Sequence, residues 1–289
     1  MRHRLQLITI AIAIASTALQ CSPSGGGRRA VGTSRAAQPA VFRDGRFLID
    51  RNDNHIWDGA AGGDSEVILG EKGDIPVAGD WDGGGRWEVG VFRDGQWLLD
   101  FNANGRWDGA EGGDRSFTFG QAGDVPVSGD WNGDGAVEVG VYRDGLWLLD
   151  ANGNQQWDGP AAGDLEIRFG DARVVPLSGD WNGNGHSRIG TWFEGLWALD
   201  YNGDFAWDGP GEGVWYRGEG HDRYTGLGQK GDLCVPADWN GDGIWEAAVF
   251  QRGRWLIDQN DSGRWDGPEG GDLLFDYGAA GDIPVAAPW

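Results

Sequence analysis

The chain contains 289 residues, including 54 glycines and 18 tryptophans, so turns and large aromatic side chains are unusually frequent. Acidic residues outnumber basic ones by 45 to 23, which gives a net charge of −22. Such a surface repels nucleic acid and anionic membranes and favours cations as partners. The two cysteines, Cys21 and Cys234, are too few for a disulfide framework.

Residues 1–21 combine a short basic start with the apolar run LITIAIAIASTAL. This run is too short to span a bilayer comfortably, so it predicts a signal peptide and no membrane span. Cleavage after Ala18 and cleavage before Cys21, with a lipid anchor on that cysteine, both stay open, although Gln20 is a poor residue before a lipid-modified cysteine. A buried N-terminal element is the alternative to a signal. We expect bacterial export, to the medium, the cell surface or the periplasm. The Gly/Ser-rich residues 22–39 predict a flexible linker.

A unit of about 50 residues repeats from residue 40 to residue 289. Its first anchor is the tryptophan of a GDW motif, and its second is an aromatic strand followed by a two-residue turn, as in FRDGQWLLD from Phe92. The first anchor occurs at Trp81, Trp131, Trp181, Trp239 and Trp289, with spacings of 50, 50, 58 and 50 residues.

Each unit predicts four short antiparallel strands. In the second unit these are IPVAGDW, WEVGVFR, QWLLDF and SFTFG, separated by Gly, Asp and Asn. The pair Asp94-Gly95 suits a type I′ turn, which joins the second and third strands in a tight hairpin. Four antiparallel strands in about 50 residues are typical of one blade of a β-propeller.

The ends of the array favour a closed ring. The chain enters midway through a unit at residue 40 and leaves midway through another at residue 289, and the two fragments add up to one unit. A ring completes that blade by pairing its N- and C-terminal strands, whereas a linear stack needs polar caps. We therefore predict an all-β, five-bladed propeller over residues 40–289, and a monomer. An open β-solenoid is the alternative fold.

Fourteen of the 18 tryptophans fall at recurring positions, which predicts packing between blades. They are the five GDW residues, the third-strand set Trp97, Trp147, Trp197 and Trp255, and the WDG set Trp57, Trp107, Trp157, Trp207 and Trp265.

Acidic loops follow the first strand of each complete unit. Two of them place oxygen-bearing side chains at positions 1, 3, 5 and 9, with a glycine at position 6 that permits the bend. These residues are Asp130, Asn132, Asp134 and Glu138 in one loop, and Asp238, Asn240, Asp242 and Glu246 in the other. Hard cations take six to eight oxygen ligands, and the spacing suits Ca²⁺ best. Position 12, where an EF-hand has glutamate, is Val141 or Val249, so these loops are not EF-hands.

Two further copies of this loop are weaker candidates. One keeps Asp80, Asp82 and Glu88 but has Gly84 at position 5. The other keeps Asp180, Asn182 and Asn184 but has Arg188 at position 9, where the guanidinium would replace the charge of an ion.

A second set of loops follows the third strand and begins at Asp50, Asp100, Asp150, Asp200 and Asp258. Most copies have two carboxylates at the corresponding positions. Calcium binding and Asx-turns, in which Asp and Asn bond to their own backbone, explain this pattern equally well.

The motif D-x-N-x-D-G-x-x-E at residues 130–138 and 238–246 resembles the bacterial FG-GAP/VCBS-type repeats, which are similar to the propeller of integrin α subunits. The resemblance covers residues 40–289. It implies a calcium-stabilised propeller in a secreted or surface protein engaged in adhesion or recognition.

The 50-residue period is broken once, between Trp207 and Gly231, by about eight additional residues. An aromatic and polar cluster in this segment is our candidate ligand site, because loops on a rigid scaffold commonly carry recognition. A tolerated insertion whose aromatics fold back onto the ring is the alternative. The cluster comprises Trp215, Tyr216, Arg217, His221 and Tyr224. Trp87 and Trp245, which share one position just inside the acidic loops, are weaker candidates.

Three functions fit these observations. The first is a binding or adhesion module for glycans or proteins. The second is a glycoside hydrolase, against which near-identical blades argue, because one catalytic centre needs residues that differ between blades. The third is a structural surface protein. No nucleophile triad, zinc motif or phosphate loop is present in the sequence, so we expect no enzymatic activity.

Overall fold

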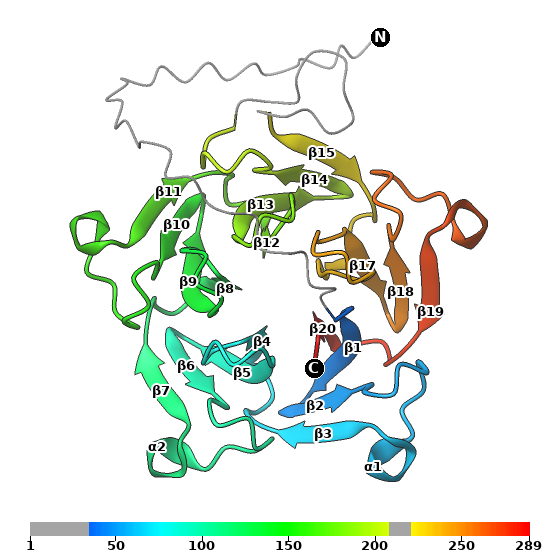
Figure 1. Cartoon of the computed structure of the whole chain (residues 1–289), viewed down its shortest axis with the longest axis horizontal. Helices are drawn as coiled ribbons and strands as arrows, with labels where there is room; N and C mark the ends of the chain where they lie inside the picture. Colours follow the sequence, from blue (N-terminus) through cyan, green and yellow to red (C-terminus); the bar gives the residue numbers. More distant parts are fainter. Residues whose placement is uncertain (1–34, 208–220) are drawn as a thin grey trace, which may run out of the picture. The chain divides into compact units, whose positions relative to one another are not determined.

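The computed structural model describes residues 35–207 and 221–289. Within these residues the chain forms five four-stranded antiparallel sheets, arranged as blades around a common centre (Figure 1). The chain is thus the all-β, five-bladed propeller predicted from the repeat. The predicted signal peptide lies outside the described residues.

From the innermost strand outward, the blades have the order given by the hydrogen-bonded strand pairs. Blade 1 is β20 (Ile283–Ala287), β1 (Gln38–Arg43), β2 (Arg46–Ile49) and β3 (Ser65–Ile68); blade 2 is β4 (Ile75–Gly79), β5 (Glu88–Arg93), β6 (Gln96–Leu99) and β7 (Arg115–Thr118); blade 3 is β8 (Val125–Gly129), β9 (Glu138–Arg143), β10 (Leu146–Leu149) and β11 (Leu165–Arg168); blade 4 is β12 (Val175–Gly179), β13 (Arg188–Phe193), β14 (Leu196–Leu199) and β15 (Arg223–Gly226); blade 5 is β16 (Leu233–Cys234), β17 (Ala248–Gln251), β18 (Arg254–Ile257) and β19 (Leu273–Asp276). Single helical turns precede four outer strands: α1 (Gly59–Gly62), α2 (Gly109–Gly112), η1 (Pro160–Ala162) and η2 (Pro268–Gly270).

The hairpin between the second and third strands of each blade depends on its two turn residues. Asp94 and Gly95 have φ angles of 51° and 92°, as a type I′ turn requires. A Cβ atom on Gly95 would lie 2.8 Å from the carbonyl oxygen of Gly120, so the site excludes any larger residue. The sequence prediction of this turn is confirmed.

The ring closes through blade 1, whose innermost strand comes from the other end of the chain. Strand β20 pairs antiparallel with β1 from Gln38 opposite Ala287 to Phe42 opposite Ile283. Strand β1 begins two residues before the expected start of the domain. This closure excludes the open solenoid.

The closing pair repeats a contact that is found inside the continuous blades. Arg43 Nε donates to Asp282 Oδ1 at 2.6 Å, just as Arg143 Nε donates to Asp124 Oδ1 at 2.6 Å in blade 3. These ion pairs lock the first strand to the second at the same register.

The hydrophobic core consists of five clusters, each of which joins one blade to the next. In the cluster between blades 2 and 3, Trp97 packs with Val139 and Val141 of β9. Trp97 is fully buried, and its Nε1 donates to the carbonyl oxygen of Phe119 at 3.0 Å. The GDW and third-strand tryptophans are therefore core residues, as predicted.

The WDG tryptophans pack between blades, as predicted, but they are not all core residues: Trp157 and Trp265 are partly buried against the core clusters, whereas the other three are exposed. Trp57, Trp107 and Trp207 keep between 36% and 39% of their surface exposed. Trp207 reaches Phe169 of the preceding blade, with ring centroids 6.1 Å apart. These residues pack against their neighbours at the rim, and their recurrence in the sequence does not distinguish a rim contact from a core contact.

We expect Trp147→Ala to lower the free energy of unfolding by about 3–5 kcal/mol, because it empties a fully buried site in the core. The matched variant Trp107→Ala should cost about 1 kcal/mol, because that side chain is partly exposed. Denaturant titration followed by circular dichroism measures both. Equal losses would contradict the division between core and rim.

Candidate metal loops and a tryptophan-lined pocket

Three acidic loops bring three carboxylates together. In blades 2 and 3 the loop follows the first strand and ends at the glutamate that opens the second, whereas in blade 5 Glu246 forms an isolated bridge with Ala237 just before β17. In each set, one carboxylate oxygen per residue lies within 4.8 Å of the others: Asp130, Asp134 and Glu138; Asp238, Asp242 and Glu246; Asp80, Asp82 and Glu88. These clusters of oxygen donors are suited to a hard cation.

The main chain holds the Asp130 loop in this form. Asp130 Oδ1 accepts from the backbone N–H of Gly133 at 2.6 Å, and its Oδ2 accepts from that of Gly135 at 2.9 Å. Asn132 Oδ1 accepts from the N–H of Asp134 at 2.8 Å, and Asn132 Nδ2 donates to Glu138 Oε1 at 3.0 Å. The loop at Asp238 repeats each of these contacts.

The glutamate is the buried member of each cluster. Glu138 is 7% exposed, and its pKa is raised to about 8, first by burial and then by the charges of Asp130 and Asp134, although an N–H bond from Trp131 opposes the shift. The pKa of Glu246 is raised to about 9 and that of Glu88 to about 8, again chiefly by burial. Within the described residues, no ion pair neutralises these three carboxylates. A bound cation would supply the missing charge.

The fourth loop of this set contains a single carboxylate, that of Asp180. Asp180 accepts backbone N–H groups as its counterparts do, and Asn182 Nδ2 donates to the carbonyl oxygen of Tyr201 at 2.8 Å. Arg188 occupies the position of the glutamate, and its charge acts on Asp200, where it opposes the burial that raises the pKa of that carboxyl to about 6. The structure therefore groups ligands in three of the four predicted loops.

The second set of loops shares the backbone network but differs in its side chains. Asp150 accepts the N–H groups of Asn154 and Gln155 at 3.1 and 2.7 Å. The amide groups of Asn152 and Asn154 donate to Asp158 at 3.2 and 3.0 Å and close the loop. The Asx-turn network occurs in both sets, so it does not by itself indicate a cation. The convergence of three carboxylates is what distinguishes the Asp130 type.

The candidate ligand site in the insertion falls mostly on residues 208–220, so Trp215, Tyr216 and Arg217 lie outside the described residues. His221 is exposed and precedes β15. Tyr224 lies within β15 opposite Ala198, and its ring centroid is 4.5 Å from that of Trp207. Tyr224 thus belongs to the rim packing of blade 4.

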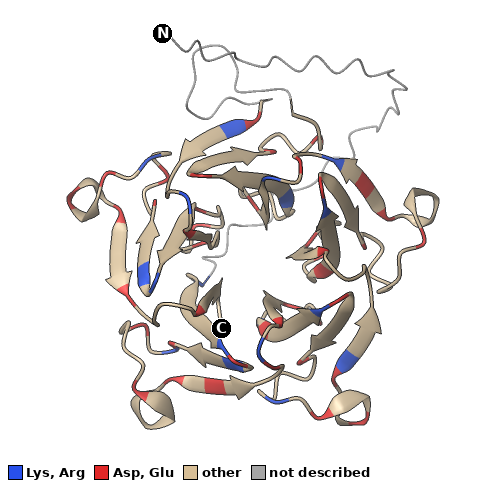
Figure 2. Ribbon diagram, turned by 180° about the vertical axis from the view of Figure 1, so that it is seen from behind, with Lys and Arg blue, Asp and Glu red and all other residues tan. Residues whose placement is uncertain are grey.

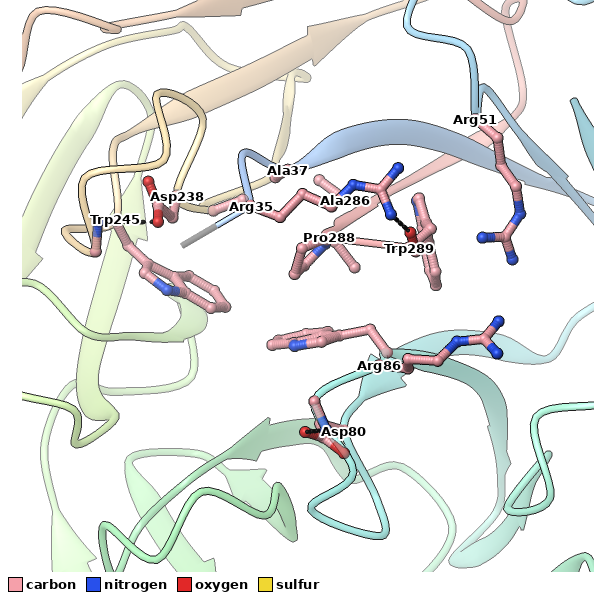
Figure 3. Close-up of a pocket in the computed structure, with 15 residues that line it drawn as sticks. Arg35, Ala37, Arg51, Asp80, Arg86, Asp238, Trp245, Ala286, Pro288 and Trp289 are labelled. Atoms are coloured by element: carbon pink, nitrogen blue, oxygen red, sulfur yellow. Dashed lines mark hydrogen bonds between the residues drawn. The ribbon is translucent and has the colours of Figure 1, made fainter. Parts of the chain in front are cut away.

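A pocket of about 600 Å³ lies beside the acidic loops that begin at Asp80 and Asp238, and it is bordered by blades 1, 2 and 5 (Figure 3). Trp87 and Trp245 line it, with ring centroids 5.9 Å apart and planes inclined by 44°. The same pair borders a second hollow, whose walls are the innermost strands and which includes Pro76, Pro126 and Pro176. The two indoles thus separate the pocket from the central channel.

Differences between blades create this pocket. The position of Trp87 and Trp245 is held by Val137 in blade 3 and by Ser187 in blade 4. Arg51 is likewise peculiar to its blade, because Phe101, Ala151, Tyr201 and Gln259 occupy the equivalent positions. A comparison of the repeats position by position is the sequence signal that identifies this site.

Three arginines, Arg35, Arg51 and Arg86, border the pocket, in a ring where every blade carries acidic loops (Figure 2). Figure 3 shows Arg51 and Arg86 on one side and Trp245 on the other. Arg35 donates to the main-chain oxygen of Trp289, and Arg51 Nε donates to Ser65 Oγ at 2.7 Å. The pocket therefore combines flat apolar faces with positive charge.

Comparison with known proteins gives no further assignment: no protein-family model and no curated protein matches this chain. Within the described residues, no helix is both long and apolar enough to cross a membrane.

In a chelating buffer, the melting temperature should fall as pH rises from about 5 to about 8. Glu138 keeps its proton up to a pKa of about 8 in the folded chain but loses it near 4.5 when unfolded, so the folded chain binds more protons in this window and stability declines with rising pH. Glu138→Gln should weaken this dependence, because it removes one titrating group. Melting curves at several pH values test this, and identical slopes for the variant and the parent chain would contradict it.

Proposed function

We propose that this chain is a binding module: an exported, calcium-stabilised propeller that recognises glycans or proteins without catalysing a reaction. The observation that carries the proposal is the pocket of about 600 Å³ between blades 1, 2 and 5. Its volume falls in the range of small-molecule sites, about 300–1,000 Å³. The two partly exposed indoles of Trp87 and Trp245 line it and supply the aromatic surface on which such ligands pack.

The acidic side chains of the pocket favour binding over hydrolysis. A glycosidase needs one carboxyl group that delivers a proton and a second that attacks or activates water. Asp238 instead accepts the N–H groups of Gly241, Asp242 and Gly243, and Asp80 accepts that of Gly85. Both carboxylates are thus committed to holding their own loops, and we propose no catalytic role for them.

Calcium enters the proposal through the three carboxylate clusters and the resemblance to FG-GAP/VCBS-type repeats. Asp130, Asn132, Asp134 and Glu138 would hold the ion in blade 3. The ion would neutralise buried carboxylates and join the end of the first strand to the start of the second. The proposal includes export to the medium, the cell surface or the periplasm, which is based on the apolar start of the sequence. It also includes a monomeric state.

Calcium removal by a chelator should lower the melting temperature markedly, because the carboxylates within each of the three clusters then repel one another. The double variant Asp130→Ala, Asp238→Ala should reproduce most of this loss in the presence of calcium. Asp180→Ala is the matched control: it removes the equivalent carboxylate, which accepts from backbone N–H groups, in a loop that has no other carboxylate, so it should leave the calcium response unchanged. Differential scanning fluorimetry measures all three, and a chelator without effect would refute the calcium proposal.

A glycan array and a panel of surface proteins test the binding function itself. We expect at least one class of ligand to bind the parent chain and to be lost with Trp245→Ala, because this change removes one of the two indoles. Trp107→Ala, at the rim, should bind as the parent does. Binding that survives Trp245→Ala would place recognition elsewhere, and the absence of any ligand would favour a structural role.

A further inference from the structure

Three positive charges meet at the pocket although the chain as a whole carries a charge of −22. Burial, followed by the neighbouring charges of Arg86 and Arg35, lowers the pKa of Arg51. Since a guanidinium stays protonated at any physiological pH, the three groups repel one another. This arrangement costs stability unless an anion lies between them.

Most other arginines of the ring have a carboxylate partner. Arg43, Arg93 and Arg143, for example, each form an ion pair with a buried aspartate. Within the described residues, no side-chain carboxylate lies at ion-pair distance from Arg51 or Arg86. Their guanidinium groups are therefore available to an anion that enters the pocket.

We propose that the ligand of this pocket is an anionic saccharide, whose acid group binds between Arg51 and Arg86 while the C–H face of a sugar ring packs on Trp87 and Trp245. This inference rests on the proposed binding function of the pocket. A planar guanidinium offers paired N–H donors to an oxyanion, which gives direction as well as charge. The indoles of Trp87 and Trp245, which also line the pocket, provide the apolar surface that a flat sugar face needs and that a bare inorganic anion does not.

Two carboxylates at the border of the pocket, Asp80 and Asp238, oppose an anion. Both belong to the acidic clusters that group three carboxylates within 4.8 Å. A cation bound in these clusters removes that opposition and leaves the arginines as the dominant charges of the pocket. The binding experiment for the anionic saccharide therefore needs calcium in the buffer.

The experiment is a glycan array with neutral, carboxylated and sulfated members, followed by calorimetric titration of the strongest binder into the full chain. We expect the saccharides that bind to be carboxylated or sulfated. Comparison of the carboxylated with the sulfated members of the array shows which acid group the pocket prefers. Arg51→Gln and Arg86→Gln should each raise Kd about tenfold or more, the loss expected for a hydrogen bond to a charged group. The exposed Arg106, paired with Asp108, supplies the control Arg106→Gln, which should not change Kd. Arg86 is itself exposed, so its variant serves if Arg51→Gln disturbs folding.

The outcomes separate this inference from the binding function. Suppose that neutral glycans bind, that Trp245→Ala abolishes this binding and that Arg86→Gln leaves it unchanged. The pocket is then a binding site, but the assignment of an anionic ligand is wrong. If polyglutamate binds and no saccharide does, the pocket takes acidic peptides, and the assignment is again wrong. If nothing binds, both proposals fail.

Discussion

The antiparallel pairing of β20 with β1 is the contact on which the ring depends. Without it, blade 1 lacks its innermost strand, β1 exposes an unpaired edge, and the fifth blade loses Val41 from its core cluster. The other four blades are each built from one continuous stretch of the chain. The closing pair joins the two ends of the described chain, so its formation carries the loop-closure entropy of the whole ring. Burial between every pair of blades offsets that entropy.

The same closure builds the pocket. Arg51 follows the third strand of blade 1, Trp289 follows the closing strand, and Trp87 and Trp245 come from the blades on either side. These residues are far apart in the sequence and meet only because the ring is closed. A regular array thereby acquires one asymmetric face, where the blades differ from one another.

Unfavourable electrostatics marks both candidate sites. In the acidic loops, three carboxylates lie together, and burial raises the pKa of the glutamate, to about 9 for Glu246. At the pocket, Arg51 faces two other guanidinium groups. Structural ion pairs such as that of Arg43 with Asp282 are instead neutral overall and lie within the sheets. Like charges gathered at one place are typical of positions that bind an ion or a ligand, because the binding energy offsets the repulsion.

The sequence by itself determined the architecture. The repeat period, the Asp94-Gly95 turn and the split unit at the two ends are local or periodic features, and each follows from backbone conformation or from the need to bury one face of every blade. It also indicated the acidic loops, because spacing along nine residues decides which side chains converge. The exposure of Trp57, Trp107 and Trp207 was decided only by the tertiary structure, since the packing of neighbouring blades determines how much of each side chain is covered. The pocket was decided in the same way, because Arg51, Trp87 and Trp245 come together only when the strands at the two ends of the chain pair.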